Sequence, residues 1–289
     1  MNSSKTDFTS CAKINLGLKI ISQRPDGYHT IETLFQEISL ADTIELEKVS
    51  NGWQFSCDNS DTPTDESNLC VQAYLELIAR FPDLGGIRIY LKKCIPIGAG
   101  LGGGSSNAAT VLKGMNKLYG LNLSNKRLEE IAHSIGADIP FFIRGETQLA
   151  SGIGEVLSPV TTPPMGAILL VTLPIQIDTE WAYREVKNHL SDHSRKGKFA
   201  AAYEKVDFSL PFSWHKVEKL FENDFEPLVF QTYPEIGRIK DQLLENGAEF
   251  ASLSGSGSTV FGIYKEERDA HKVMVLFPPP FQTFIAHPI

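Results

Sequence analysis

The stretch IPIGAGLGGGSSNAA, residues 95–109, decides the fold class of this chain of 289 residues. Apolar and polar residues alternate over residues 87–92, just before it, which predicts a half-buried strand. After it, apolar residues recur at helical spacing until Gly120, which predicts a helix that ends at this glycine. The glycines between positions 98 and 104 let backbone N–H groups approach a ligand closely. Because the first amides of a helix are unpaired, this loop predicts an anion site, with phosphate as the expected ligand.

Other phosphate-binding motifs fit this stretch less well. Gly98, Gly100 and Gly103 satisfy the dinucleotide pattern G-x-G-x-x-G, but no acidic residue closes a next strand about 20 residues further on. In a Walker loop the lysine would fall at Gly104. The protein-kinase tripeptides H-R-D and D-F-G do not occur. A merely structural glycine turn is the remaining alternative, although such turns rarely need this many glycines followed by two serines.

The composition limits the class of protein. A net charge of −8 and a pI near 5.4 argue against a nucleic-acid-binding surface or a surface for anionic membranes. The first residues lack an apolar signal segment and no apolar run is long enough to span a bilayer, so we expect a cytoplasmic protein. The cysteines show no metal-ligand spacing, which predicts free thiols at Cys11, Cys57, Cys70 and Cys94.

The glycine stretch resembles the signature loop of the GHMP kinase superfamily, the small-molecule kinases that include galactokinase, homoserine kinase and mevalonate kinase. The resemblance implies a two-domain α+β fold with the active site in the interdomain cleft and ATP as phosphoryl donor. Mg²⁺ is expected from ATP chemistry rather than from any metal-ligand spacing, with Ser105 or Ser106 as its candidate ligands. One departure is Ala99, where glycine is common in the superfamily. The ATP-binding residues that the resemblance implies are Pro96, Gly98, Ala99, Gly100, Leu101, Gly102, Gly103, Gly104, Ser105 and Ser106.

Two stretches resemble one branch of this superfamily. They are LGGGSSNAA, residues 101–109, and RPDGYH, residues 24–29. The branch phosphorylates an alcohol linked to cytidine diphosphate in the non-mevalonate route to isoprenoids. The resemblance implies that Tyr28 and His29 hold the cytosine, with Tyr183 on its other side. Without the resemblance, a Tyr-His pair after a turn, or a tyrosine on a helix, is more often ordinary packing.

Two further motifs suggest the catalytic residues. In AKINL, residues 12–16, Lys13 and Asn15 project to the same side of an alternating strand, although a strand lysine alone is usually a solvated charge. In GADIPF, residues 136–141, Asp138 is alone typical of a helix N-cap. The resemblance implies that Asp138 orients the acceptor hydroxyl and takes its proton late. It also implies that Lys13 steadies the developing negative charge and that Asn15 helps to hold the acceptor.

The C-terminal half carries the third motif of the superfamily. The stretch ASLSGSGSTVFG, residues 251–262, resembles the glycine motif that supports the phosphate loop, here through Gly255, Ser256 and Gly257. Apolar spacing predicts helices over residues 213–222 and 225–245, and NDFE, residues 223–226, is assigned to helix capping. Prolines place a domain boundary near residue 160, so we expect an ATP-binding domain over 1–160 and a C-terminal domain over 161–289.

The expected protein is therefore an ATP-dependent small-molecule kinase, a monomer or weak homodimer, with a cytidine-diphosphate acceptor. Two alternatives stay open. A kinase of another small alcohol, such as homoserine or mevalonate, would share the phosphate loop but would have no reason to carry Tyr28 and His29. A non-catalytic nucleotide-binding regulator would be free to lose Lys13 and Asp138, and both are present.

Overall fold

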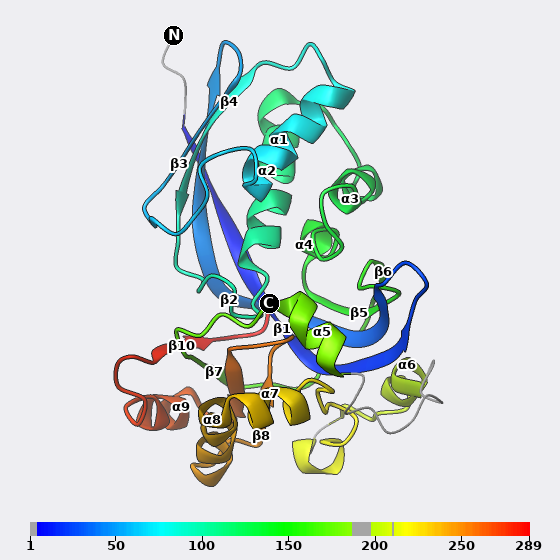
Figure 1. Cartoon of the computed structure of the whole chain (residues 1–289), viewed down its shortest axis with the longest axis vertical. Helices are drawn as coiled ribbons and strands as arrows, with labels where there is room; N and C mark the ends of the chain where they lie inside the picture. The colour runs from blue at the N-terminus through cyan, green and yellow to red at the C-terminus, as the bar shows by residue number, and fades with distance from the viewer. Residues whose placement is uncertain (1–4, 187–197, 210) are drawn as a thin grey trace. The chain divides into compact units, whose positions relative to one another are not determined.

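The computed structural model describes residues 5–186, 198–209 and 211–289, which form two compact units (Figure 1). The first unit consists of Met1–Ala12, Leu40–Ile97 and Gly102–Gly145. The second consists of Lys13–Ser39, Gly98–Leu101 and Glu146–Ile289. Two long paired strands, β1 (Thr6–Gln23) and β2 (His29–Val49), supply residues to both units. The domain boundary predicted near residue 160 stays a prediction, because the two compact units are each built from several segments and do not meet at this residue.

The first unit contains a layer of strands around the second half of β2. Strand β4 (Gly86–Lys92) runs antiparallel to β2, with Ile44 opposite Leu91, and parallel to β3 (Trp53–Cys57). The strand predicted over residues 87–92 is therefore confirmed. Its buried side chains alternate with exposed ones, as a strand with one face on a core requires.

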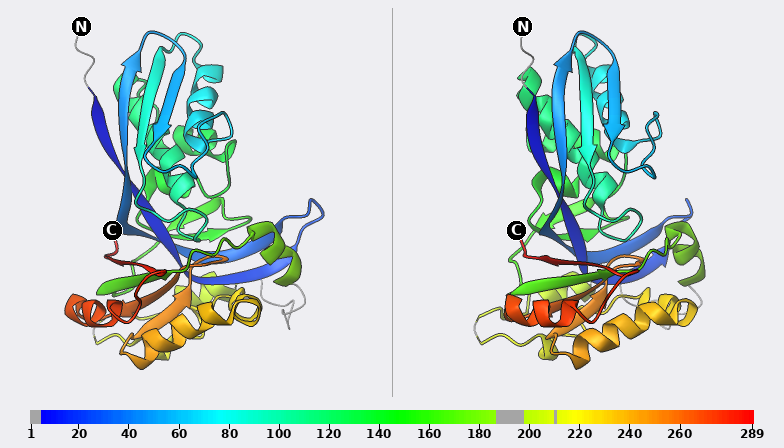
Figure 2. Two further views of the ribbon diagram at one scale, coloured as in Figure 1. Left: turned by 60° about the vertical axis from the view of Figure 1, so that its left-hand side comes forward. Right: turned by 90° about the vertical axis from the view of Figure 1, so that its left-hand side faces the viewer.

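Helices cover one face of this layer (Figures 1 and 2). Helix α1 (Leu69–Arg80) packs along α2 (Gly103–Tyr119), which is followed by α3 (Asn125–His133) and α4 (Phe141–Arg144). Helix α2 ends at Gly120 in the left-handed conformation, with φ of 63°, which confirms the predicted end of this helix. The glycine loop thus lies between a strand and a helix, as the sequence predicts.

The second unit contains two groups of strands. The first half of β2 pairs with β5 (Thr147–Ser151), which pairs with β6 (Val156–Pro159). The other group is an antiparallel sheet in the order β10-β7-β9-β8. Its strands are β7 (Ala167–Thr172), β8 (Phe250–Leu253), β9 (Val260–Tyr264) and β10 (Gln282–Ala286).

The helices α7 (Glu226–Thr232), α8 (Pro234–Glu245) and α9 (Glu267–Met274) lie together on one face of this sheet (Figure 2). Apolar residues from them, from β7 and from β1 form one core, which includes Leu18, Ile20, Leu169, Val171, Val229, Ile236 and Val273. The helices of the unit are α5 (Thr179–Val186), α6 (Lys198–Tyr203), α7 (Glu226–Thr232), α8 (Pro234–Glu245) and α9 (Glu267–Met274), with a 3₁₀ turn at Trp214–Lys216.

The helix predicted over residues 213–222 is wrong, because only Trp214–Lys216 is helical, as the 3₁₀ turn. The apolar residues of this stretch serve an aromatic cluster instead: Trp214 stacks on Phe250 with ring centroids 5.2 Å apart, and Phe221 packs beside both. In the part of the chain that the structure describes, no helix has the length and apolar character needed to cross a membrane.

Candidate active site

The phosphate loop takes the backbone shape that its glycines allow. Gly98, Gly100 and Gly102 have φ of 66°, 78° and 69°, a region that L side chains rarely adopt. Gly102 is the N-cap of α2 and provides no side chain to the first amides of the helix. Ala99 is not among the described residues with positive φ, so its methyl group causes no backbone strain. The first turn of α2 thus keeps amides available for an anion.

Gly100 is the position in this loop where a side chain cannot fit. A Cβ atom there would lie 2.1 Å from the carbonyl oxygen of Ser254, whereas at Gly98 the nearest atom, Cγ of Gln176, would be 3.5 Å away. Both glycines have positive φ, so alanine at either carries a similar conformational cost of about 1–2 kcal/mol. The difference between the two alanine variants therefore isolates the steric clash.

We expect Gly100→Ala to raise the KM for ATP at least about tenfold more than Gly98→Ala does, because the loop must move away from Ser254. Steady-state kinetics at varied ATP, with the melting temperature of each variant, measure this difference. Equal KM values in the two variants would show that the contact with Ser254 does not shape the nucleotide site.

Lys13 joins β1 to the phosphate loop inside the second unit. Its side chain is buried, and Nζ donates hydrogen bonds to Asn15 Oδ1 at 2.6 Å and to the carbonyl oxygen of Gly100 at 2.8 Å. The ammonium group also lies 5.5 Å from the centre of the Phe35 ring. The backbone N–H of Lys13 donates to the carbonyl oxygen of Leu101 at 3.0 Å. A buried amine is thus fixed beside the loop that is predicted to bind phosphate.

Asn15 is held on the same strand by a chain of hydrogen bonds. Its Nδ2 donates to Thr33 Oγ1 at 3.0 Å, and this hydroxyl donates to the carbonyl oxygen of Gly17 at 2.6 Å. Its Oδ1 therefore faces Lys13, and the two predicted site residues come together. Thr33 is a residue of this network that was not predicted. Its only signal in the sequence is a small polar residue inside a largely apolar strand, β2.

The third glycine loop, that of the third motif, residues 254–259 between β8 and β9, makes hydrogen bonds to the phosphate loop through Ser254 and Thr259. Ser254 Oγ donates to the carbonyl oxygen of Gly100 at 2.9 Å and accepts from the backbone N–H of Asn15 at 3.3 Å. The N–H of Thr259 donates to the carbonyl oxygen of Ala99 at 3.2 Å. Gly255 lies close enough that a Cβ would be 3.4 Å from Asn15 Oδ1. The functional roles assigned to Gly255, Ser256 and Gly257 stay predictions.

Asp42 is a buried acceptor that the sequence analysis missed. It lies on β2 in the first unit and accepts hydrogen bonds from Lys93 Nζ at 2.5 Å and from Asn107 Nδ2 at 2.9 Å. It also accepts from the backbone N–H groups of Cys94 and Ile95, at 2.7 and 2.8 Å. One carboxylate thus holds the end of the segment that leads into the phosphate loop.

The first turn of α2 is tied into the same network. Asn107 Nδ2 also donates to Ser10 Oγ at 2.9 Å, and Ser10 Oγ lies 2.8 Å from Ser106 Oγ. Of the two serines predicted to meet magnesium, Ser106 is therefore buried and engaged, while Ser105 is half-buried. The Asp42 carboxylate also affects the neighbouring Cys94. The pKa of the Cys94 thiol lies above its usual range, mainly because the thiol is partly removed from water and secondly because of the Asp42 charge.

Asp138 lies in the turn before α4, in the first unit, and its side chain is half-buried. Helix α4 begins at Phe141 and its N-cap position is Pro140, so Asp138 does not cap this helix. The capping alternative is therefore wrong. The pairing of Asp138 with Lys13 stays a prediction, since Lys13 belongs to the second unit.

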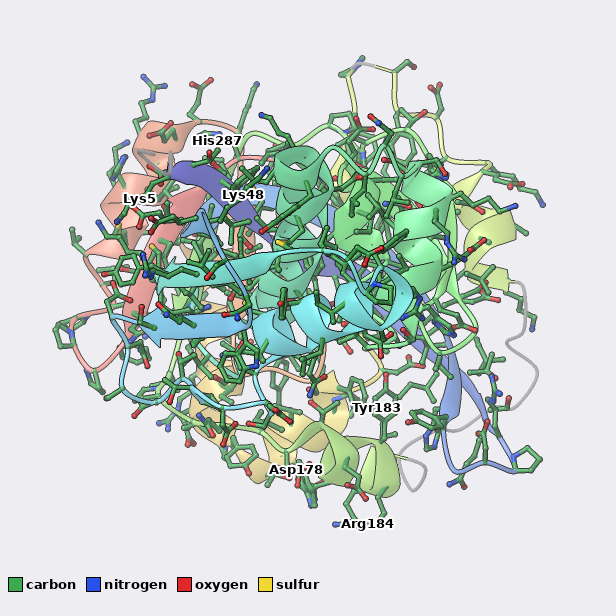
Figure 3. The ribbon with its side chains drawn as sticks, turned by 90° about the horizontal axis from the view of Figure 1, so that it is seen from above. Lys5, Lys48, Asp178, Tyr183, Arg184 and His287 are labelled. Carbon is green, nitrogen blue, oxygen red and sulfur yellow. The ribbon has the colours of Figure 1, made fainter. Side chains whose placement is uncertain are left out.

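The residues predicted to hold cytosine lie in the second unit. Tyr28 follows a turn closed by Gly27, at φ of 89°, and 62% of its surface is exposed. His29 is buried and stacks on Tyr183 of α5, with ring centroids 5.2 Å apart and an angle of 20°. Tyr183 and Arg184 leave α5 on different sides (Figure 3). The structure thus brings His29 and Tyr183 together and leaves Tyr28 accessible.

Comparison with known proteins identifies the family of the chain. The family model described as GHMP kinases N terminal domain matches residues 68–146, and that described as GHMP kinases C terminal matches residues 212–274. The chain is 42% identical over 285 residues to the 4-diphosphocytidyl-2-C-methyl-D-erythritol kinase of Pelodictyon phaeoclathratiforme, covering 96% of each chain.

Solved structures give the same result. A crystal structure of a 4-(cytidine 5'-diphospho)-2C-methyl-D-erythritol kinase matches with a TM-score of 0.80 and 30% identity, over 97% of this chain and 98% of that one. The mevalonate kinase of Methanococcus jannaschii matches over the whole of both chains with a TM-score of 0.74, but at 15% identity it supports the fold alone. The chain belongs to the GHMP kinases, in the branch of the 4-diphosphocytidyl-2-C-methyl-D-erythritol kinases.

Proposed function

We propose that this protein transfers the γ-phosphoryl group of ATP to the 2-hydroxyl of 4-diphosphocytidyl-2-C-methyl-D-erythritol, in non-mevalonate isoprenoid biosynthesis. The observation that carries the proposal is the pair of hydrogen bonds by which Lys13 joins Asn15 to the carbonyl oxygen of Gly100. Through these bonds the Lys13 ammonium group, on β1, lies against the glycine loop that we assign to ATP. Asn15, which we assign to the acceptor, lies on the same strand. The relatives at 42% and 30% identity are kinases of the same acceptor, which supports the same reaction.

The phosphates of ATP are assigned to the loop over residues 96–106. Its positive-φ glycines and the uncapped first turn of α2 supply amide donors and the positive end of the helix dipole. Among the described residues, no three His, Cys, Asp or Glu side chains are grouped to hold a metal ion. Magnesium bound with ATP would neutralise charge on the phosphate oxygens. Ser105 is the hydroxyl proposed to hold it, since the Ser106 hydroxyl is engaged with Ser10.

In the transfer itself, the acceptor oxygen forms a bond to the γ-phosphorus as the bond to the bridging oxygen of ADP breaks. The transition state is loose, so the protein mainly positions the reactants and neutralises charge. Asp138 orients the hydroxyl and accepts its proton late, then releases the proton to solvent. Lys13 steadies the negative charge on the transferred group. Asn15 holds the acceptor and keeps the Lys13 amine in place.

Tyr28, His29 and Tyr183 are proposed to bind the cytosine. We expect Tyr28→Ala to raise the KM for the acceptor about tenfold, because base–aromatic stacking is worth about 1–3 kcal/mol. The KM for ATP and the melting temperature should hardly change, since the Tyr28 side chain is mostly exposed. Kinetics at varied acceptor and fixed saturating ATP measure the effect. An unchanged acceptor KM would remove Tyr28 from the binding site.

The proposed function is tested by ADP release with each candidate acceptor. We expect rapid ADP formation with 4-diphosphocytidyl-2-C-methyl-D-erythritol and only background hydrolysis with homoserine, with mevalonate or without an acceptor. Phosphorus NMR should show one new phosphomonoester for each ADP. Preference for homoserine or mevalonate would favour the other small-alcohol kinases. ATP binding without turnover of any of these acceptors would favour a nucleotide-binding regulator.

A further inference from the structure

The segment ENDFE, residues 222–226, connects β1 with the third glycine loop. Residues 223–226 were predicted to cap a helix, and capping accounts for only part of their hydrogen bonds. Asn223 Oδ1 does accept from the N–H of Phe225 at 2.9 Å, but the N-cap residue of α7 is Phe225 itself, which makes no side-chain cap bond. The polar side chains of the segment make most of their hydrogen bonds to β1 and β8.

Asn223 binds the third glycine loop on both sides of Ser254. Its Nδ2 donates to the carbonyl oxygens of Leu253 and Gly255, both at 2.8 Å. Only 2% of Asn223 is exposed, so water does not replace these bonds readily. The two donors of one amide therefore fix the backbone immediately before and after Ser254.

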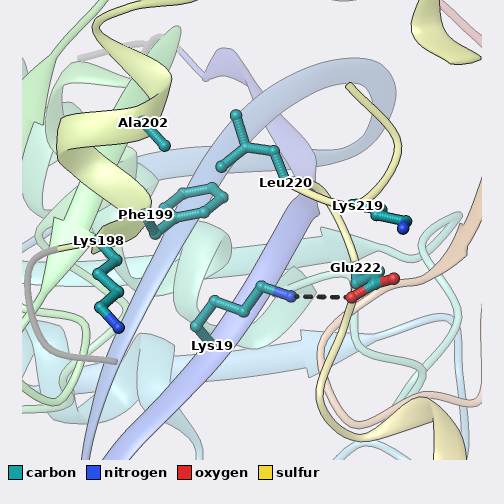
Figure 4. Close-up of a pocket in the computed structure, with 7 residues that line it drawn as sticks. All are labelled: Lys19, Lys198, Phe199, Ala202, Lys219, Leu220 and Glu222. Atoms are coloured by element: carbon teal, nitrogen blue, oxygen red, sulfur yellow. Dashed lines mark ion pairs between the residues drawn. The ribbon is translucent and has the colours of Figure 1, made fainter. Parts of the chain in front are cut away.

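The same segment is fixed to β1. The N–H of Leu18 donates to the carbonyl oxygen of Glu222 at 3.1 Å, and the N–H of Asp224 donates back to the carbonyl oxygen of Leu18 at 2.9 Å. Asp224 Oδ2 accepts from the N–H of Ile20 at 2.8 Å. Lys19 Nζ lies 3.6 Å from Glu222 Oε2, as Figure 4 shows, and 3.7 Å from Asp224 Oδ1. Backbone and side-chain bonds thus hold residues 222–224 against the strand that carries Lys13.

Glu226 fixes the end of β8 from the other side of the segment. Its Oε1 accepts from Ser252 Oγ at 2.9 Å and from the N–H of Leu253 at 3.0 Å, and its Oε2 accepts from Lys240 Nζ at 2.6 Å. The residue before Ser254 is therefore held by both Asn223 and Glu226. Segment 222–226 leaves the loop little freedom to shift along β1.

We infer that Asn223 is a positioning residue for phosphoryl transfer, acting through Ser254. The hydroxyl of Ser254 accepts from the N–H of Asn15 and donates to the carbonyl oxygen of Gly100, the same oxygen that accepts from Lys13 Nζ. When the two amide donors of Asn223 hold the backbone around Ser254, they also set the distance between this hydroxyl and the phosphate loop. The expected effect on kcat rests on the proposed function, whereas the expected effect of Asn223 on ATP binding can be measured without it.

The test compares Asn223→Asp and Asn223→Ala with Asn116→Asp. Asn116 is a matched control, because its Nδ2 donates to the carbonyl oxygen of Leu123 at 3.1 Å at the far end of α2. In Asn223→Asp a carboxylate oxygen faces two carbonyl oxygens, so we expect the KM for ATP to rise and kcat to fall, each at least about fivefold. The acceptor KM should stay within about twofold, whereas Asn116→Asp should lower only the melting temperature.

A double-mutant cycle with Ser254→Ala tests whether Asn223 acts through this hydroxyl. If it does, Asn223→Ala combined with Ser254→Ala should raise the KM for ATP little more than the larger single change, because the two residues share one effect. If the effects of Asn223→Ala and Ser254→Ala on the KM for ATP multiplied in the double variant, the two residues would act independently and the inference would be overturned. Kinetics of the Asn223 variants equal to those of Asn116→Asp would also overturn it. Calorimetry measures the ATP affinity of the Asn223 variants and of the Asn116→Asp control without any turnover. If Asn223→Asp does not fold, Asn223→Ala still provides this comparison. Failure of the wild-type protein to phosphorylate the acceptor would instead reject the proposed function.

Discussion

Asp138→Asn lowers kcat at least about 100-fold, the low end of the effect of a positioned acid–base group. The amide keeps the shape of the side chain but cannot take the proton of the acceptor hydroxyl, and it orients the hydroxyl less strongly. The KM for ATP should change little, because the nucleotide is assigned to the loop over residues 96–106. Steady-state ADP release at saturating acceptor measures both quantities.

Asp83→Asn is the control for this variant, because Asp83 is an exposed aspartate of the same unit with no proposed role. It should keep wild-type kinetics. Near-normal turnover by Asp138→Asn would remove Asp138 from the chemistry and would leave Lys13 without its proposed partner. If the loss of kcat came with a clearly lower melting temperature than that of Asp83→Asn, the result would indicate a structural role for Asp138 instead.

Asp42→Asn is expected to cause the largest loss of stability. The Asp42 side chain has no exposed surface and Lys93 has 7%, so the variant leaves a buried ammonium group without its carboxylate. Breaking a buried ion pair from one side typically costs about 3–5 kcal/mol. The new NH₂ group would also face hydrogen-bond donors in either orientation. These donors are the backbone N–H groups of Cys94 and Ile95, which share Oδ1, or the side chains of Lys93 and Asn107, which share Oδ2. Urea unfolding, with ATP kinetics on the folded variant, measures the two effects.

Glu45→Gln is the matched control on the same strand. Glu45 pairs with Lys5 at 2.6 Å, but the Lys5 side chain is 58% exposed, and exposed ion pairs are worth about 0–1 kcal/mol. The two variants remove the same charge from β2 and differ in burial. If they lost equal free energy of unfolding, the network around Asp42 would not be what fixes the start of the phosphate loop.

Local features of the fold could be predicted because neighbouring residues determine them. Alternation of apolar and polar residues predicts the strand over residues 87–92. The run of glycines predicts the loop that follows it, and Gly120, which takes the left-handed conformation, predicts the end of the helix. Ser124 is another example. A serine just before an apolar run at helical spacing is a typical N-cap, and the Oγ of Ser124 accepts from the N–H of Arg127 at 3.3 Å at the start of α3. Such caps need only a few residues of the chain to form.

The connections that shape the site could not be predicted from one sequence, because their partners are far apart along the chain. Ser254 contacts Asn15 across 239 positions and Gly100 across 154. Asp42 meets Cys94 across 52. Nothing near Asp42 in the sequence indicates a partner, and the motif that contains Ser254 indicates the phosphate loop only through the resemblance to the superfamily. The predicted helix over residues 213–222 failed for a related reason, because its apolar spacing serves the cluster of Trp214 and Phe250.

The central claim is that Lys13 and Asp138 act on the acceptor oxygen while ATP occupies the glycine loop. A crystal structure with a non-hydrolysable ATP analogue and the cytidine-diphosphate acceptor tests this most directly. We predict the Asp138 carboxylate within hydrogen-bond distance of the acceptor 2-hydroxyl, Lys13 Nζ beside the γ-phosphate, and loop amides on the phosphate oxygens. A complex in which either side chain lies far from the hydroxyl and the γ-phosphate would contradict the account.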